Sequence, residues 1–149
     1  MPENKQSRSS VICGGHRYRN APEMIEWLCR VLGFERHAVY AGPNGTIAHA
    51  ALTFGRGMIL LASYSDTDSQ RLLKQPAEIG GAETRHVYLL VPNADEVYAR
   101  VKAAGAEIVL EIKDQGYGGR GFTCGDPEGH IWNVGTFDPW EVEAIEEKD

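Results

Sequence analysis

The residues best suited to chemistry in this chain are its cysteines and histidines, because thiols and imidazoles serve as nucleophiles, bases and metal ligands. The three cysteines lie far apart and form no CxxC pair, which argues against a zinc knuckle or a disulfide framework. The histidines form no HxH or HExxH arrangement. Four of the five are therefore interpreted as ordinary polar or capping side chains, namely His16, His37, His49 and His130.

The composition indicates one globular domain that is large enough to bury a core. The 149 residues are 42% hydrophobic and 24% charged, which is ordinary for a globular protein. A formal net charge of −6 without a dense basic stripe disfavours a nucleic-acid partner. No apolar run approaches the roughly 20 residues that span a bilayer, and residues 1–10 contain no signal-peptide core. These features predict a soluble cytoplasmic domain with no membrane partner.

The elements that must position any functional residue include a hairpin near the end of the sequence. Residues 122–124 and 130–134 are rich in aromatic and β-branched side chains and predict two short strands. Between them, Asp126 can bond the local backbone, Pro127 fixes φ, and Gly129 accepts a positive φ. The second of these strands carries Asn133.

A repeated unit precedes and includes this hairpin. Residues 11–18 predict a strand, Asn20 and Glu23 predict a helix start with a capping box, and Gly33 predicts the helix end. Strands are then predicted at 35–41, 46–54 and 58–64. The same order returns with a strand at 85–91, a helix from Asn93 to Gly105, a strand at 108–112 and the hairpin.

The repeat predicts an α+β fold of two tandem βαβββ units. Neither unit alone can cover both faces of its sheet, so we expect helices on the outer faces and a curved mixed sheet around a cleft. The predicted organisation is a disordered N-terminal tail at 1–10, one domain at 11–138 and an acidic C-terminal tail at 139–149. Within the domain, unit one covers about 11–64, a linker 65–84 and unit two about 85–138.

These motifs resemble the vicinal oxygen chelate superfamily, which includes glyoxalase I, fosfomycin-resistance proteins, extradiol dioxygenases and bleomycin-resistance proteins. The resemblance runs from about Val11 to Asp138. Its matching pieces are residues 17–22 before the first helix, Gly33 and Phe34 after it, His86 at the start of unit two, and residues 122–130. The continuation of the last piece to residues 135–140 resembles a glyoxalase-like, uncharacterised branch.

The resemblance also implies where a divalent metal would be held. The family's first-strand ligand falls on Cys13, the unit-two ligand on His86, the last-strand Glu on Asn133, and a fourth ligand near Leu61. A neutral amide and an aliphatic side chain are poor ligands, and two good ligands rarely hold zinc. We therefore predict that no cofactor is bound, with a metal held by Cys13 and His86 as the alternative.

Each of these residues also has an ordinary interpretation. Cys13 can be a small buried side chain, although a nearby base such as His86 would make it a nucleophile. His86 can be a hydrogen-bonded interior histidine, and Asn133 suits hydrogen bonding to a ligand or to a neighbour better than it suits chemistry.

Strand alternation extends the candidate site, because residues i and i+2 share a face. Tyr117 and Arg120 in a glycine-rich stretch are expected to close over a ligand, with Arg120 suited to an anionic group or, equally, to a surface role. The predicted ligand-binding residues are Cys13, Arg17, Leu61, His86, Tyr88, Tyr117, Arg120, Thr123, Ile131 and Asn133. No catalytic residue is assigned.

Three functions remain open. The first is metal-independent binding or sequestration of a small organic molecule in the cleft between the units, as in bleomycin-resistance proteins. The second is a metal-dependent glyoxalase-like lyase, isomerase or dioxygenase, and the third is a structural or regulatory domain without a ligand. The resemblance also implies a homodimer.

Overall fold

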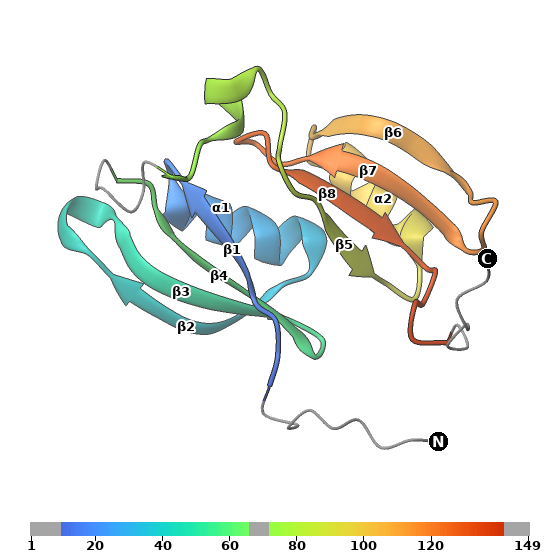
Figure 1. The fold of residues 1–149 in the computed structure, drawn as a ribbon, viewed down its shortest axis with the longest axis horizontal. Helices are drawn as coiled ribbons and strands as arrows, with labels where there is room; N and C mark the ends of the chain where they lie inside the picture. The colour runs from blue at the N-terminus through green and yellow to red at the C-terminus, as the bar shows by residue number, and fades with distance from the viewer. Residues whose placement is uncertain (1–9, 66–71, 142–149) are drawn as a thin grey trace, which may run out of the picture. The chain divides into compact units, whose positions relative to one another are not determined.

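The fold is that of a computed structural model, which describes residues 10–65 and 72–141 and divides the chain into two compact units, residues 1–73 and 74–149 (Figure 1). Most of the two predicted tails, and the middle of the predicted linker, lie outside the described residues. No helix in the described residues is long and apolar enough to cross a membrane.

Unit one has the predicted βαβββ order. Its elements are β1 (Gly14–Tyr18), α1 (Ala21–Trp27) with a π-helical continuation η1 (Leu28–Leu32), β2 (Glu35–Ala41), a 3-10 turn η2 (Pro43–Gly45), β3 (Ile47–Phe54) and β4 (Gly57–Ser63). The strand order is β1-β4-β3-β2, with β1 and β4 parallel and the other neighbours antiparallel.

Unit two repeats this arrangement. Its elements are a 3-10 turn η4 (Pro76–Ile79), β5 (Val87–Leu90), α2 (Ala94–Ala103), β6 (Glu107–Asp114), β7 (Arg120–Gly125) and β8 (Ile131–Gly135). The order β5-β8-β7-β6, with β5 and β8 parallel, matches unit one position for position. The α+β class and the tandem βαβββ units are confirmed.

The helix ends follow the predicted chemistry. The Asn20 and Asn93 side chains each accept a hydrogen bond from the backbone N–H three residues on, at 3.4 and 3.1 Å. The Asn20 amide also donates to the Glu23 carboxylate at 2.7 Å, which adds a side-chain bond within the same pair. Gly33, at φ 95°, and Gly105, at φ 73°, end the two helices in the left-handed region.

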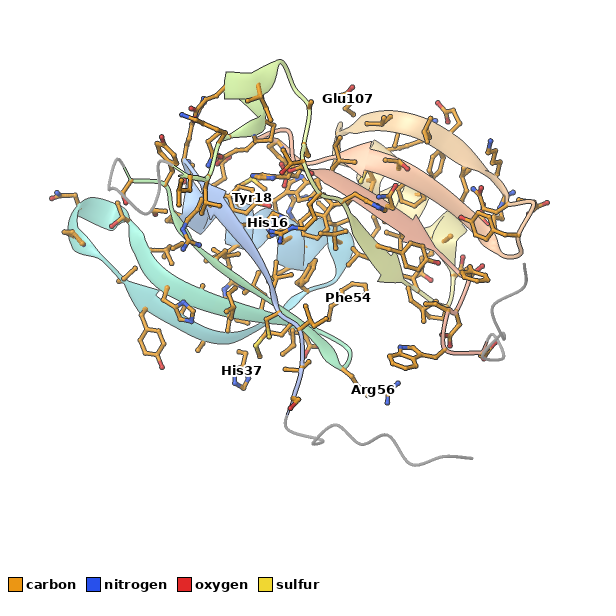
Figure 2. All side chains as sticks on the ribbon, viewed as in Figure 1. His16, Tyr18, His37, Phe54, Arg56 and Glu107 are labelled. Carbon is orange, nitrogen blue, oxygen red and sulfur yellow. The ribbon has the colours of Figure 1, made fainter. Side chains whose placement is uncertain are left out.

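Each sheet buries one face. In unit one, the helix residues Met24, Ile25 and Leu28 are buried together with Leu52 and Leu61 of the sheet. Figure 2 labels His16 and Tyr18 on β1, whose buried rings stack with centroids 5.9 Å apart. In unit two the buried apolar residues include Leu89, Val97, Val101, Phe122, Cys124, Trp132 and Val134. Each large apolar side chain removed from water in this way contributes about 1.5–3 kcal/mol.

The turn between β7 and β8 is stabilised by the buried Asp126 carboxylate. Its Oδ1 accepts the backbone N–H groups of Glu128 and His130, both at 3.0 Å, and its Oδ2 accepts the indole N–H of Trp132 at 3.1 Å. Gly129 has φ 91°. The predicted turn chemistry is confirmed, and it fixes the start of β8.

Candidate functional site

The candidate site lies on the face of the unit-two sheet opposite α2. Phe122 packs edge-to-face against Tyr98 of α2, so the even-numbered residues of β7 face the helix. Thr123 therefore faces the other way. It is paired with Asn133 on β8 and with Leu110 on β6, and Asn133 is paired with Tyr88 on β5. These four side chains form one row across the open face.

A pocket of about 290 Å³ occupies this face. It is lined by His86, Tyr88, Leu110, Glu111, Lys113, Gln115, Tyr117, Arg120, Gly121, Phe122, Thr123, Asn133, Val134, Gly135 and Phe137. Six of the ten predicted ligand-binding residues are in this set, and the structure brings them together from three strands and two adjoining segments.

Two facing glycines leave room for the pocket. Gly121 and Gly135 are register partners on β7 and β8, in the row next to Thr123 and Asn133. A Cβ on Gly121 would come within 2.7 Å of the Val134 carbonyl oxygen, and a Cβ on Gly135 within 2.9 Å of the Tyr88 hydroxyl. The second row of the open face therefore carries no side chain here, and the Tyr88 ring lies against the gap.

Three aromatic residues border this floor. The Tyr88 hydroxyl donates to the Phe137 carbonyl oxygen at 2.6 Å, and the Tyr117 ring meets the Phe137 ring edge-on with centroids 5.1 Å apart. Burial raises the pKa of Tyr88, with a further increase from Tyr117, so its hydroxyl remains a donor at neutral pH. The aromatic border is thus held to the segment that follows β8.

The polar end of the pocket is a connected set of hydrogen bonds. The Thr123 hydroxyl donates to Asn133 Oδ1 at 2.8 Å. Asn133 Nδ2 lies 3.2 Å from the Val87 carbonyl oxygen and 3.1 Å from His86 Nδ1. Every polar atom of the Asn133 side chain therefore has a partner within unit two, and the amide is fixed in one orientation.

Several predicted site residues lie elsewhere. Leu61 is only 1% exposed, and its register partners His16 and Ala50 are buried too, so it belongs to the unit-one core and does not line this pocket. Ile131 is on the pocket face of β8 but does not line the pocket. Cys13 is half-buried just before β1, and Arg17 is half-buried on the face of β1 opposite His16.

Arg120 lines the pocket, yet its guanidinium is directed to the helix side of the sheet. Its Nε lies 2.9 Å from an Asp95 carboxylate oxygen on α2, and one terminal nitrogen lies 3.4 Å from Asp114. Two carboxylates therefore already neutralise the charge that was expected to meet an anionic ligand. Alternation along β7 could have placed the Arg120 side chain on the helix side of the sheet, because Arg120 and Phe122 are two residues apart.

The family of the chain follows from a comparison of its sequence with family models. Residues 16–134 match the model described as the Glyoxalase/Bleomycin resistance protein/Dioxygenase superfamily. The chain belongs to this superfamily. The match includes both βαβββ units and confirms the resemblance drawn from the sequence.

Sequence relatives of the chain include uncharacterized proteins from mycobacteria. The chain is 31% identical over 94 residues to Mb0911c of Mycobacterium bovis and to Rv0887c of Mycobacterium tuberculosis. These matches cover 63% of this chain but only 61% and 55% of the two relatives, so the chain spans somewhat more than half of their length.

Solved structures of superfamily proteins share the fold. TioX from Micromonospora sp. ML1 is 29% identical, with a TM-score of 0.65 over 85% of this chain and 94% of TioX. The fosfomycin resistance protein FosX from Listeria monocytogenes is 14% identical, with a TM-score of 0.65 over 91% of this chain and 98% of FosX. One FosX structure contains Mn(II) and a sulfate ion. At this identity FosX shows the fold alone.

The superfamily's metal-dependent members raise the question of whether the residues here fit a cation. His86 and Asn133 are at the unit-two positions where the family resemblance implies metal ligands, and the Asn133 atom nearest His86 is the amide nitrogen. A cation at this point would meet amide hydrogens and not lone pairs. Among residues 10–65 and 72–141, no group of three or more His, Cys, Asp or Glu side chains could hold a metal. The donor set does not fit.

Proposed function

We propose that this superfamily member binds a small organic molecule in the pocket of its second unit, and that this binding does not use a metal. The observation that carries the proposal is the composition of the pocket. It combines an aromatic border, a glycine floor and one fixed polar cluster, which is the arrangement expected of a small-molecule site. A cavity volume of about 290 Å³ suits a ligand of one or two rings.

The metal-independent part of this proposal rests on the Asn133 amide. In a metal site the side chains present lone pairs to one point, whereas here Thr123, Asn133 and His86 satisfy one another. Sequestration requires only complementary shape and a few polar anchors, so it is the superfamily activity that makes the fewest demands on this pocket.

Fragment screening by NMR tests the binding function. We expect one- and two-ring aromatic fragments to shift the amide resonances of Thr123, Asn133 and Gly135, and we expect His86→Ala to weaken those shifts. His37→Ala changes an exposed histidine of β2 in the other unit and serves as the matched control. Failure of every fragment to shift pocket resonances would contradict the proposal.

Metal analysis separates binding from the metal-dependent alternative. Protein purified without chelators is expected to contain no stoichiometric divalent metal. Added Ni²⁺, Zn²⁺ or Mn²⁺ is expected to leave the midpoint of thermal unfolding unchanged. A metal that bound only the folded state would raise this midpoint. A near-equimolar metal that disappears in His86→Ala would instead support a metalloenzyme.

We also propose that the chain forms a homodimer, as the family resemblance implies. The edge strand β2 exposes Tyr40, 61% accessible, and Val39, which are side chains that a second copy could cover. Light scattering after size exclusion should give twice the 16.4 kDa chain mass, and a monomer would refute this. A cytoplasmic location remains a prediction from the sequence.

A further inference from the structure

The Asn133 side chain determines which nitrogen of His86 carries the proton. The Val87 carbonyl oxygen can only accept a hydrogen bond, so the Asn133 end that lies 3.2 Å from it must be the amide nitrogen. The amide oxygen then faces Thr123, whose hydroxyl can donate. The amide orientation is thereby assigned from two partners that do not include the histidine.

The second amide hydrogen has one remaining partner. Asn133 Nδ2 is 3.1 Å from His86 Nδ1, so Nδ1 accepts and carries no proton. In a neutral imidazole the proton is then on Nε2, which becomes a hydrogen-bond donor. Thr123 directs its own proton to Asn133 and offers only lone pairs. Among the three side chains Thr123, Asn133 and His86, the Nε2–H group of His86 is therefore the donor not already used within the cluster.

We propose that Asn133 is a positioning residue that holds His86 in the Nε2–H tautomer, so that the pocket selects flat ring compounds bearing an acceptor oxygen such as a ketone or amide carbonyl. This rests on the proposed binding function and names the ligand class for that same site. The ring lies on the floor of Gly121 and Gly135 beside Tyr88, and the carbonyl oxygen accepts from His86 Nε2.

The same geometry explains why Asn serves at this position better than an acid. A carboxylate at 133 could not donate to the Val87 carbonyl oxygen, and it would draw a proton onto His86 Nδ1. The imidazole would then be a cation paired to an internal carboxylate. Asn133 itself adds no charge beside the imidazole, which suits an uncharged carbonyl ligand.

Long-range ¹H–¹⁵N correlation NMR tests the tautomer in the full chain without any ligand. The His86 signals are assigned by their absence in His86→Gln. At pH 7.5 we expect an unprotonated Nδ1 and a protonated Nε2 in the wild type, and protons on both nitrogens in Asn133→Asp. Thr123→Val keeps the His86 contact and should retain the wild-type tautomer, which separates this effect from general damage to the fold. A wild-type imidazole protonated on Nδ1 would overturn the proposal.

A matched pair of probes tests the ligand class. In 2-isopropenylnaphthalene a CH₂ group replaces the carbonyl oxygen of 2-acetylnaphthalene, with little change of shape. We expect the ketone to bind roughly fivefold more tightly, as one neutral hydrogen bond allows, and His86→Leu to abolish the difference. Equal affinities would overturn the acceptor preference while leaving pocket binding intact. If neither probe shifts a pocket resonance, both the ligand class and the binding function fail.

Discussion

Replacing Asp126 with alanine should destabilise the second unit severely, although this residue lies outside the pocket. The carboxylate accepts three hydrogen bonds at 3.0–3.1 Å and is only 6% exposed. Two of the donors are themselves buried. They are the backbone N–H of His130 and the indole N–H of Trp132, whose side chain is 0% exposed.

The expected cost follows from removing the carboxylate acceptor of these two buried donors. A buried donor deprived of its acceptor costs about 1–3 kcal/mol, and two such donors predict a loss of about 4 kcal/mol for Asp126→Ala. The Asp126→Asn variant keeps one acceptor oxygen, which can still accept either the two backbone N–H groups or the indole N–H. The loss should therefore be about 2 kcal/mol. The N–H of Glu128 is half-exposed, and water can replace its lost contact.

Urea unfolding followed by far-UV circular dichroism measures these differences, with Asp114→Asn as a control at a carboxylate that is 87% exposed. A double-mutant cycle with Trp132→Phe isolates the indole bond, because the cost of the smaller ring enters both arms of the cycle and cancels, and it should return a coupling of about 1–2 kcal/mol. If Asp126→Ala lies within about 1 kcal/mol of the wild type, the turn is not held by buried hydrogen bonds and this reasoning fails.

Two further changes test the pocket and the core of the same unit. Gly135→Ala places a Cβ within 2.9 Å of the Tyr88 hydroxyl, so the Tyr88 ring must move and lose its hydrogen bond to Phe137. We expect ring fragments to bind roughly fivefold more weakly to this variant in an NMR titration. Unchanged affinity would contradict the role of the glycine floor. Burial, with a smaller effect of the nearby Asp126, raises the pKa of Cys124 from 9.0 to about 12. Because the folded state holds the neutral thiol, its stabilising effect is present below pH 9 and is lost as the pH rises toward 12. Between pH 8 and 10 the wild type should therefore lose about 1.4 kcal/mol more than Cys124→Ala in urea unfolding, and parallel losses would refute this.

Much of the fold could be predicted because local chemistry and the repeat agree. The capping residues Asn20 and Asn93 occupy equivalent places in the two units, and Gly33 and Gly105 end the helices that they begin. These signals depend on a few neighbouring residues, so no knowledge of tertiary contacts was needed. The identical strand order in the two sheets then followed from the repeat.

The pocket face could be predicted wherever the strands are regular. Alternation along β8 correctly separates the buried Trp132 and Val134 from Asn133, and alternation along β5 separates Leu89 from Tyr88. The sequence could not reveal that Asn133, Thr123 and His86 would bond to one another, because this depends on register between strands as well as on the direction of each side chain.

Strand β6 shows where alternation fails. Strict alternation would place Ile108 and Leu110 on one face, but Ile108 pairs with Cys124 on the helix side and Leu110 pairs with Thr123 on the open side. Register shifts on either side of Leu110 change the parity, as β-bulges do. The pocket residues Glu111, Lys113 and Gln115 were not predicted, because no cleft face was assigned to this strand or to the segment after it. Phe137 was missed because it follows β8, where alternation no longer applies.

The turn and the pocket are connected through strand β8. Trp132 and Asn133 are adjacent and point to opposite faces, so the bond from the Trp132 indole to Asp126 fixes the register of the strand from the core side. A slip of one residue would exchange the two faces and remove the Asn133 amide from His86 and Thr123. The bond between Trp132 and Asp126 therefore secures the hairpin and also determines which hydrogen-bonding groups face the pocket. Weakening the turn with Asp126→Asn should consequently broaden the His86 ring resonances even under conditions where the unit remains folded, whereas sharp, unchanged resonances would show that β8 keeps its register without the turn.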